Sequence, residues 1–217
     1  MMKASSLKTE GKRFEILMSA AAAFRHHGYH GASVDEIASA LNMTKGNLYY
    51  YFRNKEDILY VCHDYSLDLI LKTLKDVEDS GDPPEKKVHR LVESFVHLYI
   101  DVLKGTAWTL EVEALSPAHR KKIIEKRDRF DRGFRAILLE GMHSGVFAPS
   151  NPKLLAFAIL GAINWIPRWY DPSGRASAGE IARVFADFLS AGMLGSSVDA
   201  IRPGETVSPV ATATQGL

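Results

Sequence analysis

Apolar residues recur at helical spacing along nearly the whole sequence, and this regularity is the strongest constraint on the fold. In the segment that begins at Val34, apolar residues stand at positions i, i+3, i+4 and i+7, ending at Leu41. That spacing places them on one face of an α-helix, whereas a half-buried strand would alternate apolar and polar residues. Since no convincing alternation occurs elsewhere, the sequence predicts an all-α fold of about nine helices.

The distribution of turn residues divides the chain into three parts. Residues 1–54 contain one long helical segment followed by two short ones with tight connections, and residues 55–194 contain mostly long segments. From Gly195 onward Gly, Pro, Ser, Thr and Ala dominate, and such a segment buries too little apolar surface to stay ordered. We therefore expect an N-terminal head (residues 1–54), a larger helical domain (residues 55–194) and a flexible tail (residues 195–217).

The overall charge does not reveal a partner. The chain has 27 basic and 26 acidic residues, so a surface for nucleic acid would have to be built from locally placed cations. The single cysteine, Cys62, excludes an internal disulfide framework and fits a reducing cytoplasm. The apolar run at residues 154–166 is shorter than the roughly 18 residues that a membrane-spanning helix needs. These features predict a cytoplasmic protein without membrane contact.

Two short helices separated by a tight turn are expected within the head. Ser33 and Thr44 stand where N-caps should, and Glu36 completes a capping box with Ser33. A longer helix, from about Lys8 to His27, precedes the pair. This is the layout of a helix-turn-helix, in which the second short helix enters the major groove of DNA. The segment Thr44–Phe52 is therefore the predicted recognition helix.

The side chains expected on the outer face of this helix suit DNA. Hydroxyl, amide and ammonium groups can bond base edges and phosphates, and tyrosine rings can contact thymine methyl groups. Gly46 removes side-chain bulk where the helix must approach DNA closely, while Leu48 and Phe52 are expected to point into the head. Lys55 and the helix N-terminus at Ser33 are placed for phosphates. The predicted DNA-binding residues are Ser33, Thr44, Lys45, Gly46, Asn47, Tyr49, Tyr50 and Lys55.

The run GASVDEIASALNMTKGNLYYYFRNKEDIL (residues 31–59) closely resembles the N-terminal domain of the TetR family of regulators. The resemblance implies a three-helix head on a helical ligand-binding domain, working as a homodimer on a palindromic DNA operator. It assigns DNA contacts to Lys45, Gly46, Asn47, Tyr49, Tyr50 and Lys55. It assigns capping or phosphate binding to Ser33 and Thr44.

The segment from Pro152 to Trp169 is apolar nearly all round, and a helix apolar on every side is buried on every side. We expect one side to pack on its own domain and the other on a second subunit. The last helix, from Ser177 to Met193, offers a matching apolar stripe, and the pair resembles the four-helix dimer interface of TetR-like proteins. The predicted interface residues are Leu155, Ala158, Ile159, Gly161, Ala162, Phe185 and Phe188. The alternative is that both helices are only intramolecular core.

An arginine between tryptophans marks the end of the same apolar helix. Arg168 can bind phosphate or carboxylate in a fork, and Trp165 and Trp169 supply stacking surfaces. Residues 161–182 and 113–129 resemble the TetR-family repressors of fatty-acid and steroid breakdown, which respond to acyl-coenzyme A thioesters. The resemblance implies an acyl tail in the helical core and a nucleotide among basic residues. The predicted ligand-binding residues are Trp165, Arg168, Trp169 and Arg120.

Competing interpretations remain for these residues and for the whole chain. Arg168 could form an ion pair across the dimer interface, and the tryptophans could be interface packing. The leading functional hypothesis is a repressor that an effector releases from DNA by shifting its conformational population. The alternatives are a multidrug-type TetR regulator for an aromatic or cationic ligand, and a DNA-organising protein without a ligand.

Enzymatic chemistry is not expected. The sequence has no nucleophile–base motif, metal-ligand pair or phosphate-binding loop, so we predict neither a catalytic site nor a cofactor. His26, His27 and His30 lie close together but bracket a helix end without a carboxylate at ligand spacing. We therefore expect them to be solvated or packed rather than metal ligands.

Overall fold

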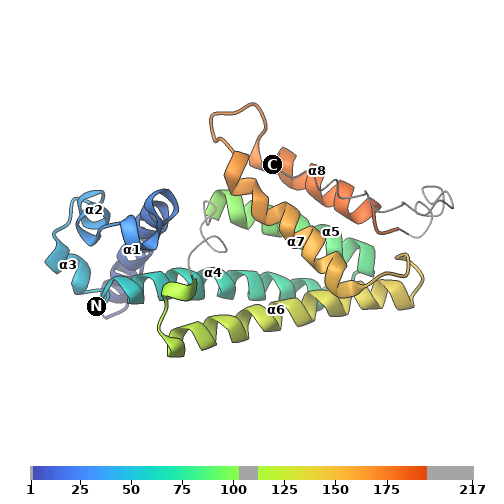
Figure 1. Ribbon diagram of the computed structural model, residues 1–217, viewed down its shortest axis with the longest axis horizontal. Helices are drawn as coiled ribbons and strands as arrows, with labels where there is room; N and C mark the ends of the chain where they lie inside the picture. Colours follow the sequence, from blue (N-terminus) through green and yellow to red (C-terminus); the bar gives the residue numbers. More distant parts are fainter. Residues whose placement is uncertain (1, 103–111, 195–217) are drawn as a thin grey trace, which may run out of the picture.

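The computed structural model describes residues 2–102 and 112–194, and within these ranges the chain forms eight α-helices (Figure 1). Their bounds are α1 (Met2–Gly31), α2 (Val34–Ser39), α3 (Lys45–Tyr49), α4 (Lys55–Glu78), α5 (Pro84–His97), α6 (Pro117–His143), α7 (Pro152–Trp169) and α8 (Ala178–Ala191). A π-helical turn, η1 (Leu98–Val102), follows α5, and a 3₁₀ turn, η2 (Val112–Ala114), precedes α6. The predicted all-α fold is confirmed.

Two sequence expectations fall outside the described part of the chain. The apolar residues of segment 107–115 predict a short helix, and of this segment the structure describes only the η2 turn and Leu115. The expected flexible tail, residues 195–217, also lies outside the described residues. Among the helices that are described, none is both long enough and apolar enough to cross a membrane.

Local capping fixes the short helices of the head. The Ser33 hydroxyl oxygen accepts the Glu36 N–H at 2.9 Å, and the Thr44 hydroxyl oxygen accepts the Asn47 N–H at 3.2 Å. These bonds satisfy backbone donors that a helix start leaves unpaired. The turn between α2 and α3 passes through Asn42, whose φ of 53° lies in the left-handed region that asparagine tolerates.

The first helix breaks where the sequence places its end. Gly28 has φ 67° and ψ 169°, a conformation open to glycine because it lacks a Cβ atom. The chain continues as a short helical turn to Gly31 and then enters α2. The break redirects the chain, so that α2 packs against α1 and α3 packs against α2.

The buried apolar residues form two cores, and both include part of α4. The head core contains residues of α1–α3, the first half of α4 up to Leu67, and three residues near the start of α6: Val112, Leu115 and Ile123. The helical-domain core begins on α4 at Ile70 and continues through α5, α6, α7 and α8. A single helix therefore passes from one core into the other, and the packing changes partner within α4.

The helices are arranged so that the head occupies one end of an elongated molecule (Figure 1). From the head, α4 runs along α6, and α5, α7 and α8 lie above this pair in the view shown. The outermost helix, α8, packs mainly on α5, where His89 Nε2 lies 2.9 Å from Asp187 Oδ1. One face of α7 and α8 is therefore left at the surface of the subunit.

Candidate DNA-binding, interface and effector sites

The predicted recognition helix, α3, lies at the far end of the head (Figure 1). Its polar side chains are exposed. Leu48 is fully buried and Phe52 is 2% exposed, whereas Tyr49 and Tyr50 are 40% and 81% exposed. The remaining predicted DNA-binding residues are exposed, apart from Lys55, which is half-buried: Ser33, Thr44, Lys45, Gly46 and Asn47. The inward and outward faces of this helix are those expected from its sequence.

Contacts within the head orient some of these groups. The Lys45 ammonium donates to Asp35 Oδ2 at 2.9 Å, and this hydrogen bond and charge raise the pKa of Lys45 above its usual value. The hydroxyl oxygens of Ser33 and Thr44 accept the capping bonds described above. Because a hydroxyl both accepts and donates, each can still donate its own proton to a phosphate.

Gly46 has no packing role in the described part of the head. A Cβ atom built at this position would meet only the Thr44 hydroxyl oxygen, at 3.8 Å, which is ordinary van der Waals contact. A glycine inside an exposed helix destabilises it by roughly 0.5–1 kcal/mol relative to alanine. The fold of the head therefore does not account for a glycine at this position.

Lys55, the first residue of α4, lies against the break in α1. Its Nζ donates to the His30 carbonyl oxygen at 3.3 Å and lies 4.6 Å from the ring centre of Tyr29. This contact holds the start of α4 against the residues that precede α2. An ammonium group carries three N–H donors, so a phosphate can be added to the same contact.

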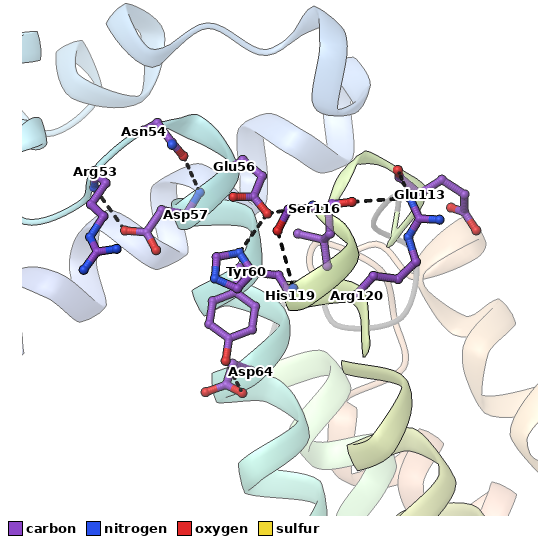
Figure 2. Close-up of polar contacts among 11 residues, drawn as sticks. Arg53, Asn54, Glu56, Asp57, Tyr60, Asp64, Glu113, Ser116, His119 and Arg120 are labelled. Carbon is purple, nitrogen blue, oxygen red and sulfur yellow. Dashed lines mark hydrogen bonds and ion pairs between the residues drawn. The ribbon is translucent and has the colours of Figure 1, made fainter. Parts of the chain in front are cut away.

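Glu56, the next residue, joins α4 to the start of α6 (Figure 2). Its Oε1 accepts the Ser116 N–H at 2.9 Å and lies 2.8 Å from His119 Nδ1. The His119 ring stacks on Tyr60 with centroids 3.9 Å apart. Burial alone would raise the pKa of the Glu56 carboxyl, but the bonds from Ser116 and His119 outweigh it and hold the pKa below its usual value. We call Glu56, Tyr60, Ser116 and His119 the α4–α6 junction.

Sequence reasoning missed this junction. The cap at Ser116 is visible in the Ser-Pro start of α6, but its carboxylate partner stands 60 positions earlier in the chain. No local pattern relates the two segments.

Arg120 does not join the other predicted ligand-binding residues. Its Nη2 donates to the Glu113 carbonyl oxygen at 2.6 Å and to the Leu115 carbonyl oxygen at 3.3 Å, so it holds the turn before α6 (Figure 2). The start of α6 and the end of α7, which carries Arg168, lie on opposite sides of the molecule (Figure 1). The expected set of four residues is therefore split into two places.

Trp165, Arg168 and Trp169 do lie together, on the surface of α7. Trp165 is 62% exposed, and the Arg168 guanidinium carbon lies 5.9 Å from its ring centre. Trp169 stacks on Phe185 of α8 with centroids 6.2 Å apart. The two tryptophans belong to an exposed apolar surface beside Arg168, which we call the outer face. It comprises Leu154, Phe157, Ala158, Gly161, Trp165 and Trp169 of α7 with Val184 and Phe188 of α8.

The predicted interface residues divide by burial. Ala158, Gly161 and Phe188 are exposed on the outer face, and Leu155, Ala162 and Phe185 are half-buried at its edge. Ile159 is 1% exposed and belongs to the helical-domain core, so its side chain has no surface to offer a second subunit. Ile159 is therefore removed from the predicted set of interface residues.

A cavity of about 550 Å³ lies between the head and the helical domain, and we call it the interdomain cavity. It is lined by Arg25 and His26 of α1, Tyr99, Ile100 and Asp101 of η1, Ile166 and Pro167 of α7, and Tyr170 and Pro172 beyond α7. Its volume lies within the roughly 300–1,000 Å³ typical of small-molecule sites. None of the four predicted ligand-binding residues is among those that line it.

His27, one of the three neighbouring histidines near the end of α1, makes an ordinary polar contact. His27 Nε2 lies 3.0 Å from Glu36 Oε1, linking α1 to α2. Within the described ranges, no group of three or more histidine, cysteine or acidic side chains could hold a metal ion.

A capped helix-turn-helix joined to a larger helical domain is the layout of a DNA-binding regulator. Comparison with known families agrees with this class. Residues 16–60 match the bacterial regulatory proteins of the tetR family, and residues 81–193 match the tetracyclin repressor-like C-terminal domain. The second match covers more than half of the chain, and the protein belongs to the TetR family. It is a transcriptional regulator rather than an enzyme, as predicted.

Relatives match over most of the chain. The transcriptional repressor KstR2 of Mycolicibacterium smegmatis is 27% identical over 195 residues, which are 87% of this chain and 93% of that protein. The structure of PfmR from Thermus thermophilus is 32% identical with a TM-score of 0.72, covering 81% of this chain and 97% of that one. AibR in complex with isovaleryl coenzyme A and operator DNA is 27% identical with a TM-score of 0.71, covering 84% and 98%. The resemblance predicted from the sequence is confirmed.

Proposed function

We propose that the protein is a homodimeric repressor that binds a palindromic operator through α3 and leaves it when an acyl-coenzyme A thioester binds. The observation that carries the proposal is the presence of two unlike exposed surfaces on one subunit. The polar face of α3 suits DNA, and the apolar outer face suits a second copy.

The DNA contacts are assigned to the exposed residues around α3. Gly46 supports a close approach, because the head gains nothing from a glycine there. Tyr49 and Tyr50 present both rings and hydroxyl groups outward, while Lys55 adds a cation at the start of α4. Ser33, Thr44, Lys45 and Asn47 complete the proposed surface. Phosphate contacts would position the helix, and contacts with base edges would specify the sequence.

The dimer is assigned to the outer face. Exposed aromatic and aliphatic side chains gathered on two neighbouring helices are typical of a protein interface. Gly161 and Ala158 allow close helix approach, and a Cβ built at Gly161 meets nothing within 4 Å inside the subunit. A two-fold dimer presents two recognition helices, which matches a palindromic operator with half-sites in successive major grooves.

The effector class rests on relatives and on the cavity between the domains. The structure of AibR is a complex with isovaleryl coenzyme A and operator DNA. The interdomain cavity has the size of a small-molecule site and is walled by both parts of the chain. Arg168 and Trp165 form a second candidate contact for the nucleotide, in competition with a role in the dimer.

The operator is first identified by footprinting the protein on genomic DNA fragments. The proposal is then tested by titrating effectors into a preformed complex of the protein with this operator. Octanoyl-coenzyme A and isovaleryl-coenzyme A are expected to weaken operator binding by at least about tenfold, a change of about 1.4 kcal/mol. Coenzyme A alone is expected to have little effect. Release by a cationic aromatic dye, but by neither thioester, would favour a multidrug-type regulator. Tight binding that no small molecule changes would favour a DNA-organising protein.

A further inference from the structure

The interdomain cavity has walls from two parts of the chain that must move relative to each other if DNA binding is to be regulated. Arg25 and His26 belong to α1 and lie just before the break at Gly28. The opposite walls come from η1 and from the end of α7. A ligand in this cavity would therefore touch the head and the helical domain at once.

We propose that this cavity is the effector site and that it takes an amphipathic anion, with an apolar chain against the helical domain and a negative group against Arg25. This inference rests on the proposed function, because it places the acyl-bearing effector of that proposal in a defined site. The shared chemistry is an acyl chain that carries an anion, whether a free fatty acid or its coenzyme A thioester.

The apolar part of the lining lies on the helical-domain side. Ile100 is 7% exposed and Ile166 is fully buried, so both form a firm wall. Pro167 lies in the last turn of α7, and Tyr170 and Pro172 follow that helix. Apolar and aromatic side chains with a few polar groups are the usual lining of a small-molecule site. This side of the cavity suits an acyl chain.

The charged part of the lining gives an anionic ligand a direction. Asp101 Oδ2 lies 3.0 Å from His97 Nδ1, so the carboxylate already has a polar partner on its own domain. Arg25, on the head wall, carries a permanent charge and five N–H donors that match a carboxylate or a phosphate. Among the lining residues described, the arginine is thus on the head wall, and the carboxylate with its histidine neighbour is on the helical-domain wall. An acyl ligand would enter with its negative group toward the head.

Occupancy of such a site changes the equilibrium between arrangements of the two parts. A ligand shifts a conformational equilibrium only through its different affinities for the two states. A ligand that bridges Arg25 and the end of α7 has such a difference, because separating or tilting α1 changes both contacts together. Since the residues after Arg25 lead through Gly28 into α2 and α3, the bias reaches the recognition helix directly.

The test measures effector binding by calorimetry without DNA, using octanoyl-coenzyme A, octanoate and coenzyme A as probes. Two variants change the cavity, Arg25→Gln on the head wall and Tyr170→Ala on the other. One matched control changes an arginine outside it, Arg175→Gln in the exposed turn after α7, and a further variant, Arg168→Gln, tests the second candidate contact on α7. Circular dichroism and operator titration without effector check that each variant is folded.

We expect Arg25→Gln to weaken binding of the acyl probe by on the order of tenfold to a hundredfold, as the loss of a charge-assisted hydrogen bond predicts. Tyr170→Ala should also weaken it, while the control Arg175→Gln should bind as the wild type does. If octanoate binds as well as the thioester, the anion at Arg25 is a carboxylate. If only the thioester binds, the anion is a phosphate of coenzyme A.

Three other results would overturn the inference in different ways. If the wild type binds the thioester and the cavity variants bind it equally well, the cavity is not the site although the proposed effector class stands. Selective loss in Arg168→Gln would move the site to the outer face. If the wild type binds neither octanoyl-coenzyme A nor octanoate, the cavity proposal and the effector class both fail.

Discussion

The polar face of α3 and the apolar outer face of α7 and α8 are both exposed, but their chemistry is opposite. The exposed rings on α3 are the tyrosines Tyr49 and Tyr50, which carry hydroxyl groups, whereas the outer face exposes Phe157, Phe188 and Trp165. DNA presents a charged and hydrated surface, so its partner needs polar groups that tolerate water. A second subunit can exclude water from its interface and favours aromatic and apolar groups in the centre. The difference teaches that exposure alone does not define a site; the chemistry of the exposed face identifies the partner.

The largest expected effect comes from placing a charge on the outer face. Gly161→Arg should leave the subunit folded, because a side chain at this position meets no neighbour and arginine has the higher helix propensity. It should nevertheless block close approach of a second copy. We expect a monomer by analytical ultracentrifugation and a loss of operator affinity of about 100-fold or more, equal to about 2.8 kcal/mol.

The matched control is Ala136→Arg, which adds the same charge to an exposed position on α6. It should remain dimeric and bind the operator normally. A Gly161→Arg protein that stays dimeric would show that the outer face is not the dimer interface. The comparison of a DNA surface with a dimer surface would then no longer hold.

A smaller effect distinguishes packing from DNA contact on α3. Gly46→Ala should stabilise the head by roughly 0.5–1 kcal/mol, because alanine costs less backbone entropy in a helix. The added methyl group should nevertheless lower operator affinity by about tenfold, or about 1.4 kcal/mol. Urea unfolding and a gel-shift titration measure the two changes, which have opposite signs.

Gly11→Ala on α1 is the control, since a Cβ there also meets nothing within 4 Å. It should give a similar gain in stability without a change in DNA binding. Equal operator affinity for Gly46→Ala and the wild type would mean that α3 stays farther from DNA than proposed.

The smallest expected effect lies at the α4–α6 junction, where the two regions connect. Glu56→Gln should lower the free energy of unfolding by about 1 kcal/mol at pH 7, since it weakens bonds from Ser116 and His119. The pKa of Glu56 is lower in the folded protein than its usual value near 4.5, so the wild-type advantage is fully present above pH 4.5. It is lost as the pH falls through the lowered pKa.

Unfolding curves of the wild type and the variant at pH 7 and at steps below pH 4.5 test this dependence. Glu125→Gln, at an exposed carboxylate on α6, serves as the control and should change stability little. A difference between the wild type and Glu56→Gln that is constant with pH would remove the ionised carboxylate as its cause.

The parts that the sequence predicts well are those decided by local chemistry. The caps at Ser33 and Thr44 and the inward turn of Leu48 follow from spacing within one or two helical turns. The contact between Glu56 and His119 joins positions 63 residues apart, and no local pattern in either segment predicts that they meet. Arg120 shows the same limit, because its bonds to two carbonyl oxygens depend on the path of the preceding turn.

The error at Ile159 has a different physical origin. A helix that is apolar on all sides carries no polar stripe to mark its inner face, so periodicity cannot distinguish the core side from the partner side. In the structure Ala158 is exposed and Ile159, one position later, is buried. The interdomain cavity was missed for a related reason, since its lining comes from three separated segments.

The sharing of α4 between two cores has a mechanical consequence. The helix has 24 residues, and at 1.5 Å per residue it is a rod about 36 Å long. Its far half is held by the helical-domain core, and its near half is built into the head core. A tilt of only about 5° about the far end moves the near end by about 3 Å over this length. That displacement is as long as a hydrogen bond. A slight rearrangement of the helical-domain core, at one end of α4, is therefore enough to break contacts between the head and DNA bases at the other end.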